Sequence, residues 1–244
     1  MNTPNTPVLF DVRSARPTPA PGWRRLAAAL AVACGALLTG LAGSVAWAQA
    51  PSNPNLNAQL LVGARTNDLA LVERVLAQGA APESRNRLGK TGLLIAAENG
   101  NLAIATSMLK AGADANTVSL EKVTPLMAAS YQGAAALVQR LLEAGAKTEP
   151  LDRMHKPAIV YAAGQGQAAA LDALLAAGVD VNAAYEHQLT ALMWAAGQGH
   201  VEAVALLLAR GAQPGLRDDR GLTARDMASR AGHTAVVALL PPDP

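Results

Sequence analysis

The chain has 244 residues, of which 51% are hydrophobic and only 3% aromatic, so closely packed alanine-rich helices are expected rather than one large central core. The formal charge of +2 falls to −1 when the four arginines and the one aspartate of residues 1–48 are set aside. This near-neutral body lacks the basic surface that nucleic-acid binding requires. Cys34 is the only cysteine, which excludes a disulfide or a thiolate metal site in the rest of the chain.

Residues 1–48 have the order of a secretory signal peptide. Arg24 and Arg25 precede an uncharged apolar run, residues 26–46, and small residues follow it. Cleavage is predicted between Ala48 and Gln49, and we expect a bacterial protein that is periplasmic or secreted. The apolar run is also long enough to span a bilayer, so an inner-membrane anchor formed by residues 26–46 is the alternative.

Residues 49–55 are predicted to link this segment to the rest of the chain. The stretch PSNPNL, residues 51–56, is polar and contains two prolines. We expect it to be extended and flexible.

From Leu56 onward the chain repeats itself at a fixed interval of 33 residues, which is typical of a solenoid. Two sets of glycines mark this period. One set ends each unit, at Gly79, Gly112, Gly145, Gly178 and Gly211, and the other divides it, at Gly100, Gly133, Gly166, Gly199 and Gly232. The domain 56–244 is therefore divided into six repeats, at about 56–86, 87–119, 120–152, 153–185, 186–218 and 219–241.

Each repeat is predicted to contain two short helices. A threonine at the start of four units provides a hydroxyl that can cap the first helix; these are Thr91, Thr124, Thr190 and Thr223. The dividing glycines allow a tight turn with positive φ, and the final glycines end the second helix in a left-handed conformation. About ten residues then remain for an outward turn.

The unit openings TPLMAAS and TALMWAA and the endings LLEAGA and LLARGA resemble the ankyrin repeat. The resemblance covers essentially all of the chain after the linker. It implies an all-α repeat solenoid in which each unit has a helix-turn-helix and a β-hairpin or turn. Stacked units bury surface that one unit cannot bury alone, so the end units should differ and act as caps. Asn67, which replaces the first dividing glycine, and Arg225 and Asp226 in the last unit fit this role.

The sequence contains no recognisable catalytic constellation, so we expect neither an enzyme nor a cofactor. His200 and His233 directly follow dividing glycines, where packing against the turn is the favoured interpretation. His155 and His187 lie on neighbouring predicted hairpins, but no third metal ligand accompanies them. A metal-dependent enzyme that uses these two histidines is the least favoured alternative.

The resemblance implies binding to another protein through the hairpin tips and the exposed side of each first helix. The hairpin positions in this chain are Arg87, Leu88, Lys90, Leu120, Val123, Arg153, Met154, Lys156, His187, Leu189, Arg220 and Leu222. The helix positions are Glu98, Tyr131 and Arg230 in one row and Gln132, Gln165 and Gln198 in an amide row that starts at Asn99. We expect Leu120, Val123, Met154, Leu189 and Leu222 to face solvent and to favour protein contact.

The predicted function is thus a non-catalytic protein-binding scaffold in the cell envelope, acting as a monomer. It contacts no nucleic acid, and a membrane only through an uncleaved N-terminal segment. The amide row and Trp194 leave a glycan- or cell-wall-binding module as the alternative. For Trp194 itself, packing between repeats is favoured over a role as an exposed aromatic anchor.

Overall fold

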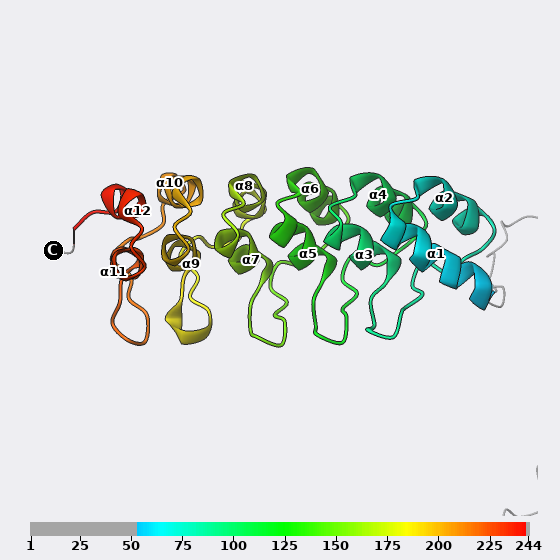
Figure 1. The fold of residues 1–244 in the computed structure, drawn as a ribbon, viewed down its shortest axis with the longest axis horizontal. Helices are drawn as coiled ribbons and strands as arrows, with labels where there is room; N and C mark the ends of the chain where they lie inside the picture. The colour runs from blue at the N-terminus through cyan, green and yellow to red at the C-terminus, as the bar shows by residue number, and fades with distance from the viewer. Residues whose placement is uncertain (1–52, 243–244) are drawn as a thin grey trace, which may run out of the picture. The chain divides into compact units, whose positions relative to one another are not determined.

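A computed structural model describes residues 53–242. Within this range twelve α-helices form six consecutive pairs (Figure 1). The first helices of the pairs are α1 (Pro54–Thr66), α3 (Gly92–Glu98), α5 (Pro125–Gln132), α7 (Ala158–Gly164), α9 (Ala191–Gly197) and α11 (Ala224–Arg230). The second helices are α2 (Leu69–Ala77), α4 (Leu102–Lys110), α6 (Ala135–Glu143), α8 (Ala168–Ala176), α10 (Val201–Ala209) and α12 (Thr234–Leu239).

The helices form two layers, with the first helices in one and the second helices in the other (Figure 1). Each first helix packs against the first helix of the next repeat as well as against its own partner. Leu93, Leu126, Ile159 and Leu192 occupy equivalent places between the layers and are at most 2% exposed. The predicted all-α solenoid is confirmed, and its core runs along the repeats instead of lying at one centre.

The signal sequence, its cleavage site and the alternative anchor at 26–46 lie outside the described residues. None of the helices within 53–242 has the length and hydropathy that crossing a bilayer requires.

The threonine caps are confirmed at the four predicted positions. The hydroxyl of Thr91 accepts a hydrogen bond from the Leu94 N–H at 3.3 Å, and that of Thr124 accepts one from the Met127 N–H at 3.2 Å. Thr190 and Thr223 cap α9 and α11 in the same way. These bonds satisfy backbone donors that the first turn of a helix leaves without partners.

The dividing glycines and the histidines that follow them form one packing motif between neighbouring repeats. Gly166 has φ +71°, and a Cβ added to it would lie 2.6 Å from the ring of His200 in the next repeat. His200 Nε2 lies 3.0 Å from the carbonyl oxygen of Gly164, and His233 repeats the arrangement with Gly197 at 3.1 Å. The predicted turn-packing role of both histidines is confirmed.

The first repeat begins earlier than the sequence predicts. Helix α1 starts at Pro54 because the side chain of Asn53 accepts a hydrogen bond from the Asn55 N–H at 3.0 Å, and proline is well suited to a first helical turn. The expectation of an extended linker is therefore wrong for residues 54–56. At the other end of this helix, Asn67 takes φ +58° where later repeats have glycine.

The last repeat closes the stack through polar contacts. Arg225 donates hydrogen bonds to the carbonyl oxygens of Val237 and Leu240, beyond which α12 does not continue. The Asp226 carboxylate accepts from the N–H and the hydroxyl of Thr223, both at 3.0 Å. The expected capping role of Arg225 and Asp226 is supported by these bonds.

The same repeat should be the first to lose stability in acid. Hydrogen bonds from Thr223 hold the pKa of Asp226 below its ordinary value of 3.8. Burial acts to raise the pKa of Asp218, but bonds from Leu222 and Arg220 outweigh it and lower the pKa. A lowered folded-state pKa contributes stability above the unfolded-state value, and this contribution is lost as the pH falls through the folded-state pKa.

We therefore expect amide protection in α11 to fall relative to that in α3 between neutral pH and about pH 3. Hydrogen exchange read by mass spectrometry measures this difference. Asp226→Asn should reduce the pH dependence of α11 and leave that of α3 unchanged. Equal loss of protection in both helices would contradict the assignment.

Candidate functional site

Five loops project from the layer of first helices, one between each pair of repeats (Figure 1). We call them fingers 1 to 5: residues 85–90, 118–123, 151–156, 184–189 and 217–222. In finger 1 one antiparallel bridge joins Arg85 to Thr91, the single bridge within residues 53–242. The fingers and the exposed sides of α3, α5, α7, α9 and α11 make up what we call the finger face.

A polar side chain holds the turn in four of the fingers. In finger 3 the Asp152 Oδ1 atom accepts hydrogen bonds from the N–H groups of Met154 and Lys156, each at 2.8 Å. Asn86, Ser119 and Asp218 make the equivalent pair of bonds in fingers 1, 2 and 5. One acceptor thus fixes the direction of the side chains that each finger presents.

Finger 4 has Tyr185 at this position and takes a different course. In its turn, η2 (Glu186–Gln188), His187 has φ +59°, whereas the equivalent residues of the other fingers do not have positive φ. Tyr185 is half-buried, and burial raises the pKa of its hydroxyl group. The sequence analysis missed this departure, although tyrosine stands where the other fingers have asparagine, serine or aspartate.

Neighbouring fingers are linked along most of the row. The Leu120 N–H donates to the Leu88 carbonyl oxygen at 3.0 Å, and the Asp219 N–H donates to the His187 carbonyl oxygen at 3.1 Å. Between fingers 3 and 4 the contact within residues 53–242 is between side chains instead, with His155 Nδ1 3.5 Å from Glu186 Oε1. The fingers therefore form one continuous rim whose connection changes at finger 4.

The predicted apolar positions are only partly exposed. Leu88, Leu120 and Met154 are 58%, 58% and 60% exposed at the finger tips. Val123, Leu189 and Leu222 are half-buried, so the expectation that they face solvent is only partly correct. Val123 and Leu189 pack against the core, because their backbone leads directly into the next first helix.

The amide row divides into two parts. Asn99 donates to the carbonyl oxygen of Ala64 at 3.1 Å, and Gln132 donates to that of Glu98. These two side chains hold neighbouring repeats together. Gln165 and Gln198 are exposed and make no side-chain hydrogen bond within the described residues, so they remain free to bind a ligand.

Most charged side chains of fingers 1 and 2 already have partners. Lys90 Nζ lies 2.6 Å from Glu98, and Arg153 lies 3.5 Å from Glu121 across two fingers. Arg87 is exposed on finger 1.

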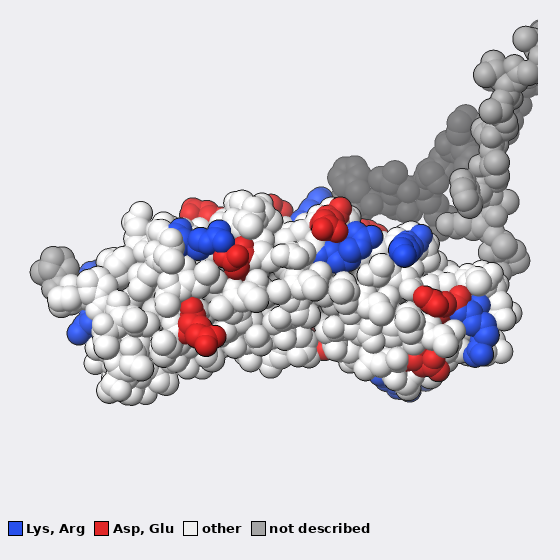
Figure 2. All heavy atoms as spheres, turned by 90° about the horizontal axis from the view of Figure 1, so that it is seen from above, with Lys and Arg blue, Asp and Glu red and all other residues white. Residues whose placement is uncertain are grey.

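On the opposite side of the solenoid, over the second helices, acidic and basic side chains are interspersed (Figure 2).

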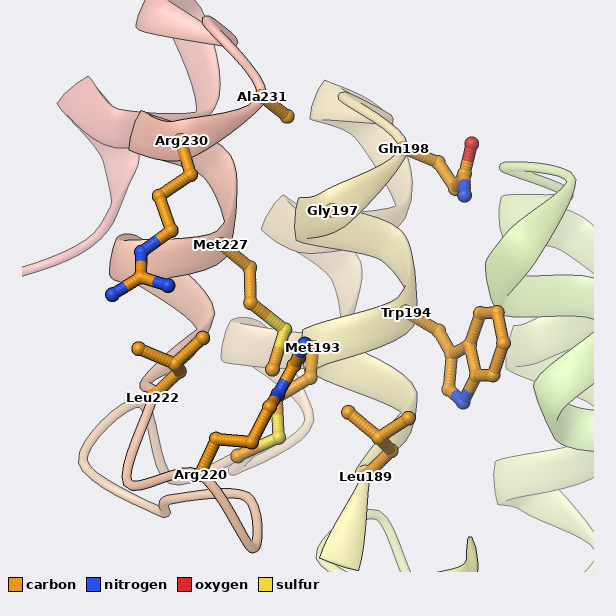
Figure 3. Close-up of a pocket in the computed structure, with 10 residues that line it drawn as sticks. All are labelled: Leu189, Met193, Trp194, Gly197, Gln198, Arg220, Leu222, Met227, Arg230 and Ala231. Carbon is orange, nitrogen blue, oxygen red and sulfur yellow. The ribbon is translucent and has the colours of Figure 1, made fainter. Parts of the chain in front are cut away.

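Three pockets open on the finger face. The Tyr131 pocket, about 250 Å³, is lined by Glu98, Val123, Met127, Ala128, Tyr131, Gln132 and Tyr161. The His187 pocket, about 200 Å³, is lined by Met154, His155, Lys156, Val160, Tyr185, Glu186, His187, Leu189 and Trp194. The Arg230 pocket, about 410 Å³, is lined by Leu189, Met193, Trp194, Gly197, Gln198, Arg220, Leu222, Met227, Arg230 and Ala231 (Figure 3). Many of the residues predicted to bind a partner therefore line these pockets.

Aromatic side chains run along the same face. The rings of Tyr131 and Tyr161 meet edge to face with centroids 6.1 Å apart. The Tyr161 hydroxyl donates to Asp152 at 2.5 Å, and burial together with this bond raises the pKa of Tyr161. Lys156 Nζ lies 4.5 Å from the ring centroid of Trp194, a favourable contact between a cation and an aromatic face.

Trp194 packs between repeats, which was the favoured interpretation, and also lines two pockets. The ring is half-buried and packs against the core, as expected for contact between repeats. Its remaining surface lines the His187 pocket and the Arg230 pocket. Trp194 is therefore a shared wall of two pockets.

The two exposed histidines line the same pocket, but each contacts a different carboxylate. His155 pairs with Glu186, and His187 Nδ1 lies 2.8 Å from Asp219. No group of three or more metal-ligating side chains occurs within residues 53–242. Nothing in this part of the chain therefore supports the metal-dependent alternative.

A family model described as "Ankyrin repeats (3 copies)" matches residues 60–152 and 159–243. Among curated proteins, none matches the chain. A crystal structure of an ankyrin repeat protein is similar at 26% identity and TM-score 0.68, covering 75% of this chain and 96% of its own. The crystal structure of an ankyrin repeat domain from Acinetobacter baumannii is similar at 31% identity and TM-score 0.65. The match covers 74% of this chain and 94% of the Acinetobacter chain. This bacterial neighbour fits the bacterial origin expected from the sequence.

Proposed function

Since the chain belongs to the ankyrin-repeat family, whose repeats are generally protein–protein interaction modules, we propose that it is a non-catalytic scaffold that binds a partner protein on the finger face. The N-terminal sequence supports a place for this scaffold in the cell envelope. The partner is then an envelope or secreted protein.

The distribution of side chains carries this proposal. The repeated leucines and alanines are buried in the stack, whereas the residues that vary between repeats line three pockets on one face. Exposed apolar side chains beside such pockets, above all Tyr131 at 46% and Met154 at 60% exposed, are typical of interaction surfaces. Because the scaffold is formed before the partner arrives, binding costs little ordering entropy.

A glycan has less support than a protein as the ligand. Sugar rings stack on open aromatic faces, and Lys156 already lies over the ring of Trp194. The amide row is also shorter than the sequence suggests, because Asn99 and Gln132 bind neighbouring backbone.

The test is site-specific photo-cross-linking in cells that produce the full chain. A photoreactive residue replaces Tyr131 or Met154 on the finger face, or the exposed Ala136 of α6 or Ala169 of α8 as matched controls on the second helices. We expect a cross-linked protein from the first two positions and none from the controls, and mass spectrometry identifies it. Cross-links from the control positions alone would refute the proposed binding face.

Cell fractionation of the same strain tests the location. We expect the chain in the periplasmic or secreted fraction, with a new N-terminus at Gln49. A chain retained in the inner membrane with residues 26–46 intact would favour the anchor. A cytoplasmic chain would refute the envelope proposal without affecting the binding face.

A further inference from the structure

The Arg230 pocket combines an apolar floor with a basic rim. Met193 is only 2% exposed, and Met227 and Leu222 are half-buried around it. In Figure 3 Met227 extends from α11 towards α9, so the two methionines form the floor between these helices. Methionine adapts to different apolar shapes, so this floor suits one large apolar side chain.

The charged side chains that line this pocket are both arginines. Arg220 extends from finger 5 and Arg230 from α11 (Figure 3). Arg220 donates through Nε to Asp218 at 2.8 Å, yet its side chain stays 66% exposed. Arg230 is exposed and forms no hydrogen bond or ion pair within residues 53–242.

The nearby carboxylates act differently on the two arginines of this rim. Asp218 forms an ion pair with Arg220 at 2.8 Å, whereas Asp226 forms no ion pair with Arg230, whose charge only helps to lower the pKa of Asp226. Asp218 is buried and accepts bonds from the N–H groups of Arg220 and Leu222. Asp226, one helical turn from Arg230, is bound to Thr223 in the capping box. The guanidinium group of Arg230 is therefore available for a carboxylate supplied from outside, which it can bind through two donors.

The pocket is open along the solenoid. Leu189 and Trp194 line both it and the His187 pocket, so the two pockets are neighbours along the solenoid beside finger 4. Gln198 also lines the pocket, and its exposed amide extends from α9 on the same side as Trp194 (Figure 3), where it offers one donor group and one acceptor to a passing backbone. This shape suits an extended internal segment better than a chain end.

We propose that the Arg230 pocket binds an extended segment of the partner protein, with a large apolar side chain between Met193 and Met227 and an adjacent aspartate or glutamate on Arg230. The inference rests on the proposed function, since it names the part of the partner that the finger face recognises. Arg220 lies at the same rim and is already paired with Asp218, so Arg230 is the arginine that binds the carboxylate. Gln198 bonds to the backbone of the segment.

A random peptide library displayed on phage, selected against the full chain, tests the specificity. Wild type should enrich peptides in which an acidic residue neighbours a large apolar one. Arg230→Gln should weaken their binding about fivefold, and Arg230→Glu should enrich lysine or arginine at the acidic position instead. Arg74→Glu, an exposed arginine on α2, is the matched control and should leave the selection unchanged.

Circular dichroism must first show that each variant is folded as wild type. Enrichment without an acidic preference, equal binding to Arg230→Glu, or no enrichment at all would overturn the inference. Peptides that bind Arg230→Glu normally but lose binding to Met154→Glu would leave the proposed function standing and place recognition at another pocket. Binding that neither substitution affects would refute both.

Discussion

Gly166→Ala is expected to destabilise the repeat domain by about 3 kcal/mol. Gly166 has φ +71°, a conformation that costs an alanine about 1 kcal/mol or more. The new methyl group would lie 2.6 Å from Cγ and Nδ1 of His200, so the ring must move. His200 then loses its bond to the Gly164 carbonyl oxygen at 3.0 Å, which is partly buried in the contact between the fourth and fifth repeats. Urea unfolding followed by circular dichroism measures the loss.

Gly178→Ala is the matched control for this substitution. Gly178 has φ +92°, but no atom lies within 4 Å of an added Cβ, so only the conformational cost of about 1 kcal/mol applies. In the double variant that combines Gly166→Ala with His200→Ala, the ring is absent and the clash is relieved. Its loss of stability should therefore lie closer to that of the control. Equal losses of stability for Gly166→Ala and Gly178→Ala would show that the His200 ring does not need the space that Gly166, without a Cβ atom, leaves for it.

The scaffold was predictable because its residues act through local geometry. A threonine before an apolar run caps a helix, and a glycine at a fixed place in each unit takes positive φ, whatever surrounds them. The 33-residue spacing of Gly100, Gly133 and Gly166 therefore predicted both the period and the turns. Arg225 and Asp226 were predictable as a cap because they break the apolar pattern of the preceding unit.

The binding face was less predictable because its properties depend on neighbouring repeats. Gln132 and Gln198 occupy the same position in their repeats, yet Gln132 binds the Glu98 carbonyl oxygen while Gln198 is free. Likewise Leu189 was expected in solvent, but it packs against the core where finger 4 leads into α9. One repeat, taken alone, does not show which side chains the adjacent repeat will cover.

Finger 4 and the pocket-lining arginines Arg220 and Arg230 show a third reason why part of the binding face could not be predicted from the sequence. Tyr185 lacks the acceptor that holds the other fingers, and the resulting turn η2 sets the wall between two pockets. Arg230 was considered only as one member of a row on the helices. Its role as the unpaired cation of a pocket emerges once Arg220 from finger 5 and Met193 from α9 lie beside it.

Asp152→Ala is expected to cost about 3 kcal/mol and to disorder the part of the finger face that carries Met154. Asp152 is 5% exposed and accepts three hydrogen bonds, from the N–H groups of Met154 and Lys156 at 2.8 Å and from the Tyr161 hydroxyl at 2.5 Å. Alanine leaves all three donors without their acceptor, so finger 3 loses its turn and Tyr161 loses its anchor beside the Tyr131 ring. Urea unfolding measures the stability, and cross-linking from position 131 reports the surface.

Asp152→Asn separates the shape of the side chain from its charge. The amide keeps one oxygen for the two backbone N–H groups, so we expect a loss of only about 1 kcal/mol and normal cross-linking. Ser119→Ala removes the weaker acceptor at the same position of finger 2, where both bonds are 3.2 Å long, and should also cost about 1 kcal/mol. If Asp152→Ala costs no more than Ser119→Ala, then packing against the core, and not this carboxylate, holds finger 3 in place.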